Sequence, residues 1–134
     1  MIFVDESHFS LNTTINKGFA LIENNCHQPK ITKVPTTIHL IAGISLKYGL
    51  EGFILTTESI NSQVFLSVLE EFDRNGTDYS LFGDNASIHI STQCMTKYFN
   101  KGVFFIKNVP YSPTLNPIEN YFGILKSHYK RLRL

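Results

Sequence analysis

Residues 111–120 read Tyr-Ser-Pro-Thr-Leu-Asn-Pro-Ile-Glu-Asn, a stretch that predicts a rigid turn followed by a helix. Its prolines restrict the backbone and lack an amide hydrogen, so a preceding strand must end before them. Asn116 suits the N-cap and Pro117 the first helical position, which puts Glu119 in the first turn. The stretch therefore delivers one carboxylate, that of Glu119, to a defined helix start.

The carboxylate of Glu119 has two interpretations at this stage. Asn116 and Glu119 stand three residues apart, the spacing of a capping box in which the Glu side chain hydrogen-bonds back to the cap residue. Alternatively, the carboxylate is aimed at other acidic side chains, and only the positions of those acids can decide. The helix itself is well predicted, because apolar residues recur along it at helical spacing: Ile118, Phe122, Leu125 and Tyr129.

The composition describes one folded domain without a disulfide framework. The 134 residues are 43% hydrophobic with a net charge of +1, which suits a single domain over residues 1–134. Cys26 and Cys94 lie far apart and form no Cys-x-x-Cys pair, which argues against a zinc site and favours a reducing compartment. The sequence has no apolar run of membrane-spanning length and no signal-peptide pattern. We expect an intracellular protein without membrane contact, nuclear in a eukaryote and cytoplasmic in a bacterium.

The chain before this stretch predicts a hairpin-rich start followed by alternating helices and strands. A turn is expected at Tyr48-Gly49, and strands at residues 2–4, 37–45, 53–57, 79–83 and 103–106, with a further strand near 17–22 and a loop over 24–33. The first helix should follow Asn61 or Ser62 and end by Asn75-Gly76, and the second should run from Ser91 to Gly102. This order indicates an α/β fold in which helices flank a mixed sheet, as in ribonuclease H-like proteins.

Three carboxylates stand at special positions in this order. Asp5 is expected at the end of the first strand, Asp84 at the end of a later strand and Glu119 at the last helix start. Each Asp taken singly is explained better by a turn, where Asp is common. Residues just past strand ends line the functional crevice of α/β sheets, however, and three acids gathered there need cations to neutralise them. Mg²⁺ prefers such oxygen ligands, and two such ions suit phosphoryl transfer on nucleic acid. Glu6 should point to the opposite face from Asp5.

Three motifs resemble the catalytic domain of mariner-type transposases, within the DDE superfamily of endonucleases. Residues 4–9, Val-Asp-Glu-Ser-His-Phe, resemble the strand of the first Asp, and residues 84–89, Asp-Asn-Ala-Ser-Ile-His, resemble the Asp-Asn-Ala-x-x-His segment. Residues 112–119 are similar to the family's Ser-Pro-Asp-Leu-Asn-Pro-Ile-Glu signature. Glu119 follows Asp84 by 35 positions, so 34 residues separate them, a spacing typical of this superfamily. The likeness covers essentially the whole chain.

The resemblance implies a ribonuclease H-like fold and two-metal DNA cleavage, after which the freed 3′-hydroxyl attacks target DNA. It implies Mg²⁺, probed by Mn²⁺ as a substitute, bound in two sites by the triad Asp5, Asp84 and Glu119. It also implies accessory roles for Asn85, His89 and Asn116, although a His at this place is explained equally well by packing or capping.

The resemblance implies DNA partners, both transposon ends and target, and a homodimer in the active complex. The basic C-terminal tail offers candidate phosphate contacts, namely Lys126, Lys130 and Arg131. A solvated helix end, with cations favourably placed at the C-terminus, explains these residues equally well.

The sequence departs from the family pattern without losing an acid. Thr114 stands where Asp is common, Phe19 where Trp is common, and Tyr121-Phe122 where the family has Trp. Relatives also carry N-terminal helix-turn-helix domains for binding DNA, which we do not expect within residues 1–134. A catalytically silent DNA-binding or scaffolding remnant is therefore the alternative to an active transposase, and a ribonuclease of RNA–DNA hybrids is a third, weaker hypothesis.

Overall fold

A computed structural model describes residues 1–10, 37–72 and 78–132 of the chain. Its elements are, in chain order, β1 (Ile2–Ser10), β2 (Thr37–Ser45), β3 (Gly49–Thr56), α1 (Ser62–Glu71), β4 (Ser80–Gly83), α2 (Thr92–Lys101), β5 (Phe104–Lys107), the 3-10 turn η1 (Pro113–Leu115) and α3 (Ile118–Leu132). The strand expected near 17–22, the loop over 24–33 and the helix stop at Asn75-Gly76 lie outside the described residues.

The strands form one mixed sheet in the order β3-β2-β1-β4-β5. β1, β2 and β3 pair antiparallel, whereas β4 is parallel to β1 and β5 is parallel to β4. The predicted hairpin start followed by alternating helices and strands is thus confirmed. The turn after β2 occupies residues 46–48, and β3 begins at Gly49, whose φ of 72° a glycine adopts without strain.

Local capping fixes the two helices between the strands. The Asn61 side chain accepts hydrogen bonds from the backbone of Gln63 and Val64, so α1 begins where the sequence predicted. Ser91 caps α2 in the same way, and Gly102, in the left-handed region at φ 66°, ends it. Gly102 thus ends α2 directly before the chain returns to the sheet at β5.

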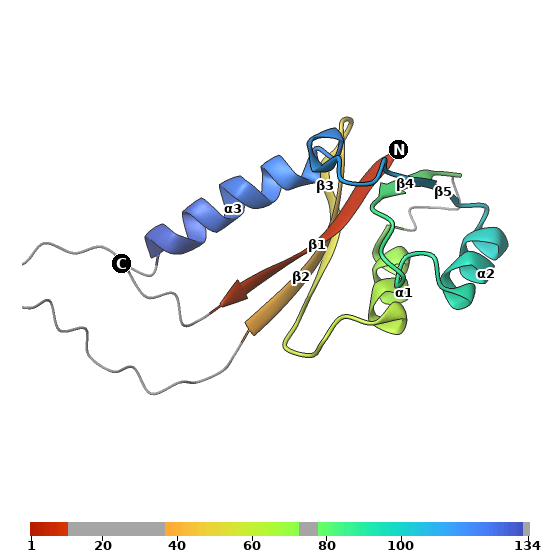
Figure 1. The fold of residues 1–134 in the computed structure, drawn as a ribbon, viewed down its shortest axis with the longest axis horizontal. Coiled ribbons are helices and arrows are strands. Elements are labelled where there is room, and N and C mark those ends of the chain that lie inside the picture. Colours follow the sequence, from red (N-terminus) through yellow and green to blue (C-terminus); the bar gives the residue numbers. More distant parts are fainter. Residues whose placement is uncertain (11–36, 73–77, 133–134) are drawn as a thin grey trace, which may run out of the picture.

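Helices α1 and α2 lie on one side of the sheet and α3 lies on the other (Figure 1). Because side chains alternate along each strand, the sheet has two buried faces. Ile2, Val4 and Ile41 point to the face covered by α1 and α2, whose core includes Phe65, Val68, Leu69, Leu81, Cys94 and Tyr98. Phe3, Phe9, Leu40 and Ala42 point to the opposite face, where Ile118 and Phe122 of α3 pack with Leu125 and Tyr129 beside them. The predicted apolar stripe of the last helix is confirmed, and it anchors α3 to β1 and β2.

The first strand is longer than predicted, and Asp5 therefore lies near the middle of the strand and not at its end. β1 continues to Ser10, paired with β2 as far as Thr37. The polar run that looks like a strand end is therefore carried within the sheet by antiparallel pairing. Among the described residues, no helix is both long and apolar enough to cross a membrane.

Candidate functional site

The strand register puts Asp5 and Asp84 at the same level of neighbouring parallel strands. β1 and β4 pair Ile2 with Leu81 and Phe3 with Phe82, and two further steps along both strands lead to Asp5 and Asp84. Because side chains alternate along a strand, Asp5 lies on the face of Phe3, the face that α3 covers. Two of the three predicted acids are thus brought together by register.

Glu119 reaches the same place from a third element, in the first turn of α3. Ile118, its neighbour, is fully buried against the β1–β2 half of the sheet and fixes the start of the helix. Asp5, Asp84 and Glu119 all line one open pocket of about 500 Å³, walled on its other side by residues 108–113. All three predicted acids therefore share one pocket, as the sequence analysis expected.

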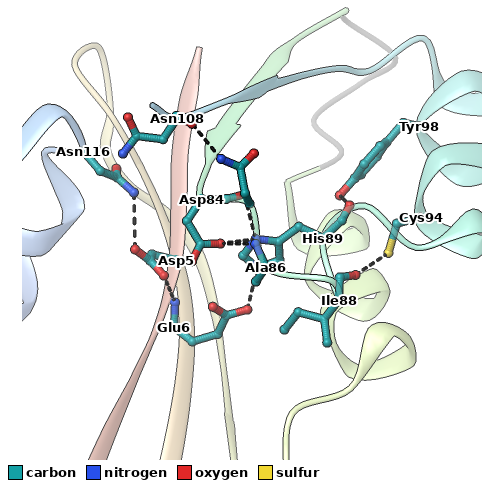
Figure 2. A network of polar contacts seen from close by, with 11 residues as sticks. Asp5, Glu6, Asp84, Ala86, Ile88, His89, Cys94, Tyr98, Asn108 and Asn116 are labelled. Carbon is teal, nitrogen blue, oxygen red and sulfur yellow. Dashed lines mark hydrogen bonds and ion pairs between the residues drawn. The ribbon is translucent and has the colours of Figure 1, made fainter. Parts of the chain in front are cut away.

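Asn116 does not act as the predicted N-cap. α3 begins at Ile118, the Asn116 amide Nδ2 donates to Oδ2 of Asp5 at 3.4 Å, and the buried Asn116 Oδ1 has no hydrogen-bond partner among the described residues. The capping box with Glu119 is accordingly absent. The Asn116 side chain instead orients the carboxylate of Asp5 (Figure 2).

The carboxyl group of Asp5 is held in an environment that disfavours its charge. Burial raises the pKa of Asp5 to about 7, and the hydrogen bond that it accepts from the backbone N–H of Glu6 at 2.8 Å opposes this shift. The nearby carboxylates of Glu6, Asp84 and Glu119 add to the increase in the pKa by repulsion. A cation in the pocket would remove this penalty.

His89 ties the Asp84 side chain to the strand that carries Asp5. Its Nε2 lies 2.6 Å from Glu6 Oε1 and its Nδ1 lies 2.8 Å from Asp84 Oδ1 (Figure 2). Since ionised carboxylates only accept hydrogen bonds, both ring nitrogens are placed as donors, which is the pattern of an imidazolium. Burial alone would lower the pKa of His89, but the hydrogen bond and charge of Glu6, together with the charge of Asp84, raise it.

The position of His89 makes it a support of the site and not part of the pocket wall. The side chain is fully buried, packs against the tilted ring of Phe65 with centroids 4.4 Å apart, and does not line the pocket. Its backbone carbonyl accepts a hydrogen bond from the Tyr98 hydroxyl at 2.9 Å. Glu6 points to the face opposite Asp5, as predicted, and there it meets His89.

Asn108 is a site residue that the sequence analysis missed. Its backbone N–H donates to Gly83 at 2.7 Å, its carbonyl accepts from Asn85 Nδ2 at 2.9 Å, and its own Nδ2 donates to the carbonyl of Ser112 at 2.9 Å. It therefore joins the Asp84 strand to the turn that leads to Glu119. The β4–β5 register ends with Gly83 beside Lys107, and one further step along both strands would place Asn108 beside Asp84.

The donor set suits a hard divalent cation. The pocket offers three carboxylates, and the buried Oδ1 atoms of Asn108 and Asn116 have no partner among the described residues. In that part of the chain no three His, Cys, Asp or Glu side chains are close enough to form a ready-made ligand cluster. Mg²⁺ commonly uses one or two carboxylates and completes its shell with water and phosphate oxygens, so an open, oxygen-lined pocket fits it.

The basic residues proposed for DNA lie away from this pocket. Lys130 and Arg131 are exposed in the last turn of α3, and Lys126 is half-buried one turn earlier. Lys130 follows Glu119 along the helix by roughly 16 Å at 1.5 Å per residue. Contact with DNA by these cations remains a prediction. Cys94 is buried as a free thiol, and Cys26 lies outside the described residues.

Known structures share this fold over nearly the whole chain. A pre-cleavage Mos1 transpososome matches 96% of the chain and 42% of its own, with a TM-score of 0.71 and 13% identity. The catalytic domain of Mos1 mariner transposase matches 96% of the chain and 58% of its own, with a TM-score of 0.63 and 13% identity. A chain of the simian T-cell lymphotropic virus intasome in complex with PP2A regulatory subunit B56 gamma matches 94% of the chain and 38% of its own, with a TM-score of 0.67 and 16% identity.

These matches confirm the predicted ribonuclease H-like α/β fold. The chain spans about half or less of the length of most of the chains that it resembles. No curated protein matches the sequence significantly. The model of one protein family, the DDE superfamily endonucleases, matches residues 1–134. The sequence motifs, the shared pocket of Asp5, Asp84 and Glu119, and this match lead to one conclusion: the chain belongs to the DDE superfamily of endonucleases.

Proposed function

We propose that the chain is the catalytic domain of a mariner-type DNA transposase, which cuts transposon ends and transfers them to target DNA. The observation that carries the proposal is the convergence of Asp5, Asp84 and Glu119, from two parallel strands and a helix start, on one open oxygen-lined pocket. Stability alone does not require three acids to share a pocket, and it is costly to bury Asp5 among them. This cost favours an active enzyme over a silent remnant of the fold.

In the proposed mechanism, Asp5, Asp84 and Glu119 would hold two divalent cations, Mg²⁺ or Mn²⁺. A cation bound there supplies Lewis-acid activation of water and neutralises charge on the phosphate. Water oxygen attacks the phosphorus, the bond to the 3′-oxygen breaks, and a proton passes to that oxygen to leave a 3′-hydroxyl. The same geometry then serves attack of this hydroxyl on a target phosphate, where the bond from phosphorus to the target's own 3′-oxygen breaks and the proton passes to that oxygen. Mos1 complexes provide a parallel, since their solved structures include paired-end complexes with Mn or Mg and a strand transfer complex.

The chain's own polar groups orient these acids in the proposal. Asn116 holds Asp5 by its amide, and the Glu6–His89 pair holds Asp84 from behind. Asn85 steadies the wall through the carbonyl of Asn108. We therefore assign Asn85, His89 and Asn116 supporting roles, with no direct contact between His89 and the phosphate because His89 is buried.

The partners in this proposal are transposon-end DNA and target DNA, with a homodimer as the active complex. Lys126, Lys130 and Arg131 are proposed to contact backbone phosphates at a distance from the pocket. The protein would act where DNA is accessible, in the nucleus of a eukaryotic host or the cytoplasm of a bacterial one. Because the formal net charge is only +1, we expect DNA affinity to depend on local contacts more than on long-range electrostatic attraction.

Nicking of supercoiled plasmid DNA tests the proposal directly. The wild-type chain should nick DNA in Mg²⁺ or Mn²⁺ and not in EDTA, and Asp84→Asn, purified in parallel, should not nick. Glu58→Gln, at an exposed residue far from the pocket in sequence, is the matched control and should retain activity. Equal nicking by Asp84→Asn and the wild type would refute the assignment. DNA binding without any nicking by the wild type would favour the silent-remnant alternative.

A further inference from the structure

Tyr111 adopts a backbone conformation at the mouth of the pocket that tyrosine rarely adopts. Its φ is 59°, the one positive value at a non-glycine position in the part of the chain that the structure describes. Bulky residues are disfavoured there because the side chain crowds the following carbonyl. Tyr111 lines the same pocket as the three acids, so the strain sits beside the candidate active site.

The turn around Tyr111 does not require an aromatic ring. The backbone N–H of Ser112 donates to the carbonyl of Val109 at 3.2 Å, which closes a four-residue turn with Pro110 and Tyr111 at its centre. Proline followed by a residue of positive φ is the pattern of a type II turn, whose third position is usually glycine or asparagine. A glycine at residue 111 would make the same turn with less strain.

Packing does not explain the ring either. The Tyr111 side chain is fully exposed, at 103% of its reference area, and has no ring contact with the described residues. Val109 and Pro110, which also line the pocket, are exposed beside it. The pocket lining thus combines three acidic side chains with an exposed apolar segment, residues 109–111, that ends in an aromatic ring.

The turn that presents this ring is stiff. Pro110 fixes one backbone angle, the Ser112 hydroxyl donates to the Pro110 carbonyl at 3.3 Å, and Asn108 holds the Ser112 carbonyl at 2.9 Å. Asn108 is itself buried and bonded to β4. A ring presented by such a turn loses little conformational entropy when it binds, which is the advantage of a preorganised contact.

We infer that the Tyr111 ring stacks on an unpaired nucleobase of the DNA strand whose phosphate enters the pocket. The inference rests on the proposed function. An aromatic face is the chemistry that recognises a base without regard to its sequence, and a base beside a reacting phosphate becomes available when it leaves the duplex stack. The strain at Tyr111 is then retained because the ring contributes to the positioning of DNA.

Three variants separate the ring, the hydroxyl and the turn. Tyr111→Gly removes the ring and relieves the strain, so its thermal stability should equal or exceed that of the wild type. Tyr111→Phe keeps the stacking face and removes only the hydroxyl. Leu115→Ala, at an exposed apolar residue that does not line the pocket, is the matched control.

The probe is a DNA duplex with a short single-stranded overhang that carries 2-aminopurine next to the junction, titrated with the full chain in Ca²⁺. The wild type, Tyr111→Phe and Leu115→Ala should quench the fluorescence with similar affinity. Tyr111→Gly should lose the quench and bind on the order of tenfold more weakly, the effect of one lost base stack. Sedimentation of each variant should be unchanged.

Several outcomes would overturn the inference. Equal quenching by Tyr111→Gly and the wild type, or no quenching by the wild type, would exclude the stack. Loss of quenching in Tyr111→Phe would assign the contact to the hydroxyl, and altered sedimentation of Tyr111→Gly alone would assign the ring to a protein interface. Wild-type quenching without plasmid nicking in Mg²⁺ would instead refute the proposed function and leave the stacking contact in place.

Discussion

Glu6 Oε1 lies 2.6 Å from Nε2 of His89, and this partly buried contact joins the first strand to the loop after β4. The other ring nitrogen of His89 is 2.8 Å from Asp84, so the imidazole connects the two strands that supply the first two acids. Glu6 follows Asp5 directly in β1, and the two side chains point to opposite faces of the sheet. Asp5 lines the pocket on one face, and Glu6 contacts His89 on the other.

Removal of the charge at Glu6 should destabilise the protein. Glu6→Gln weakens a charge-assisted hydrogen bond to a fully buried ring, and we expect a loss of about 1–3 kcal/mol in the free energy of unfolding. Urea denaturation at pH 6 measures it. The control is Glu70→Gln, which breaks the exposed Glu70–Lys97 pair and should cost about 0–1 kcal/mol. Equal, small effects of both substitutions would show that the Glu6–His89 contact is not structural.

The effect of Glu6→Gln should also depend on pH. The pKa of His89 is raised in the folded state, so the stability that pairing adds is fully present below the unfolded value of about 6.5 and is lost as the pH rises through the raised value. The gap between the wild type and Glu6→Gln should therefore narrow above that range. A gap that widens from pH 6 to pH 9 would contradict the imidazolium assignment.

Asp5→Asn should stabilise the metal-free protein at alkaline pH. The pKa of Asp5 is raised to about 7, so the wild type loses stability as the pH rises from about 4 through 7, while the neutral amide does not. Free energies of unfolding measured in EDTA should be similar at pH 4 and should favour Asp5→Asn at pH 8, by on the order of a few kcal/mol at most. A difference independent of pH would mean that Asp5 is not held in an unfavourable environment.

Glu119→Gln should leave stability unchanged and abolish nicking dependent on divalent ions. Glu119 is exposed, and Asn116 Oδ1 accepts no hydrogen bond from the described residues, so no capping box is lost. The free energy of unfolding should change by no more than about 0.5 kcal/mol, as at ordinary surface sites. A loss of about 1 kcal/mol with full nicking activity would restore the capping interpretation that the geometry excludes.

Asn108→Ala should loosen the turn that precedes α3. The substitution removes the donor to the Ser112 carbonyl and should cost about 1–3 kcal/mol in urea denaturation, with faster hydrogen exchange at the Ser112 amide. Asn120→Ala, at an exposed site in the first turn of α3, is the control and should have little effect. Unchanged exchange at Ser112 in Asn108→Ala would remove Asn108 from the supporting network.

Local patterns predicted the elements well because local physics decides them. The bounds of β2, the Asn61 cap of α1, and the Ser91 and Gly102 ends of α2 follow from β-rich runs and capping chemistry within a few residues. The convergence of Asp5, Asp84 and Glu119 was also anticipated, from their places in the element order and from the family resemblance.

The sequence-based predictions failed where contacts between residues far apart in the chain decide the structure. Asn116 satisfies every local rule for a cap, yet its amide donates to Asp5, 111 positions away, and the helix starts later. Asp5 resembles a strand end, but pairing with β2 keeps it inside β1. Asn108 carries no motif at all, and its role follows only from the register of three parallel strands. Tertiary pairing decided each of these cases.

Calorimetric titration with Mn²⁺ tests the central claim that the three acids form a metal site. Mn²⁺ accepts the oxygen ligands that suit Mg²⁺, and three carboxylates line the pocket together with Asn108 and Asn116, whose buried Oδ1 atoms have no partner among the described residues. We predict that the wild type and Glu58→Gln bind Mn²⁺ in the presence of a DNA oligonucleotide, and that Asp84→Asn does not. Binding of Mn²⁺ by Asp84→Asn as tight as that of the wild type, or no binding by the wild type with DNA present, would contradict the account.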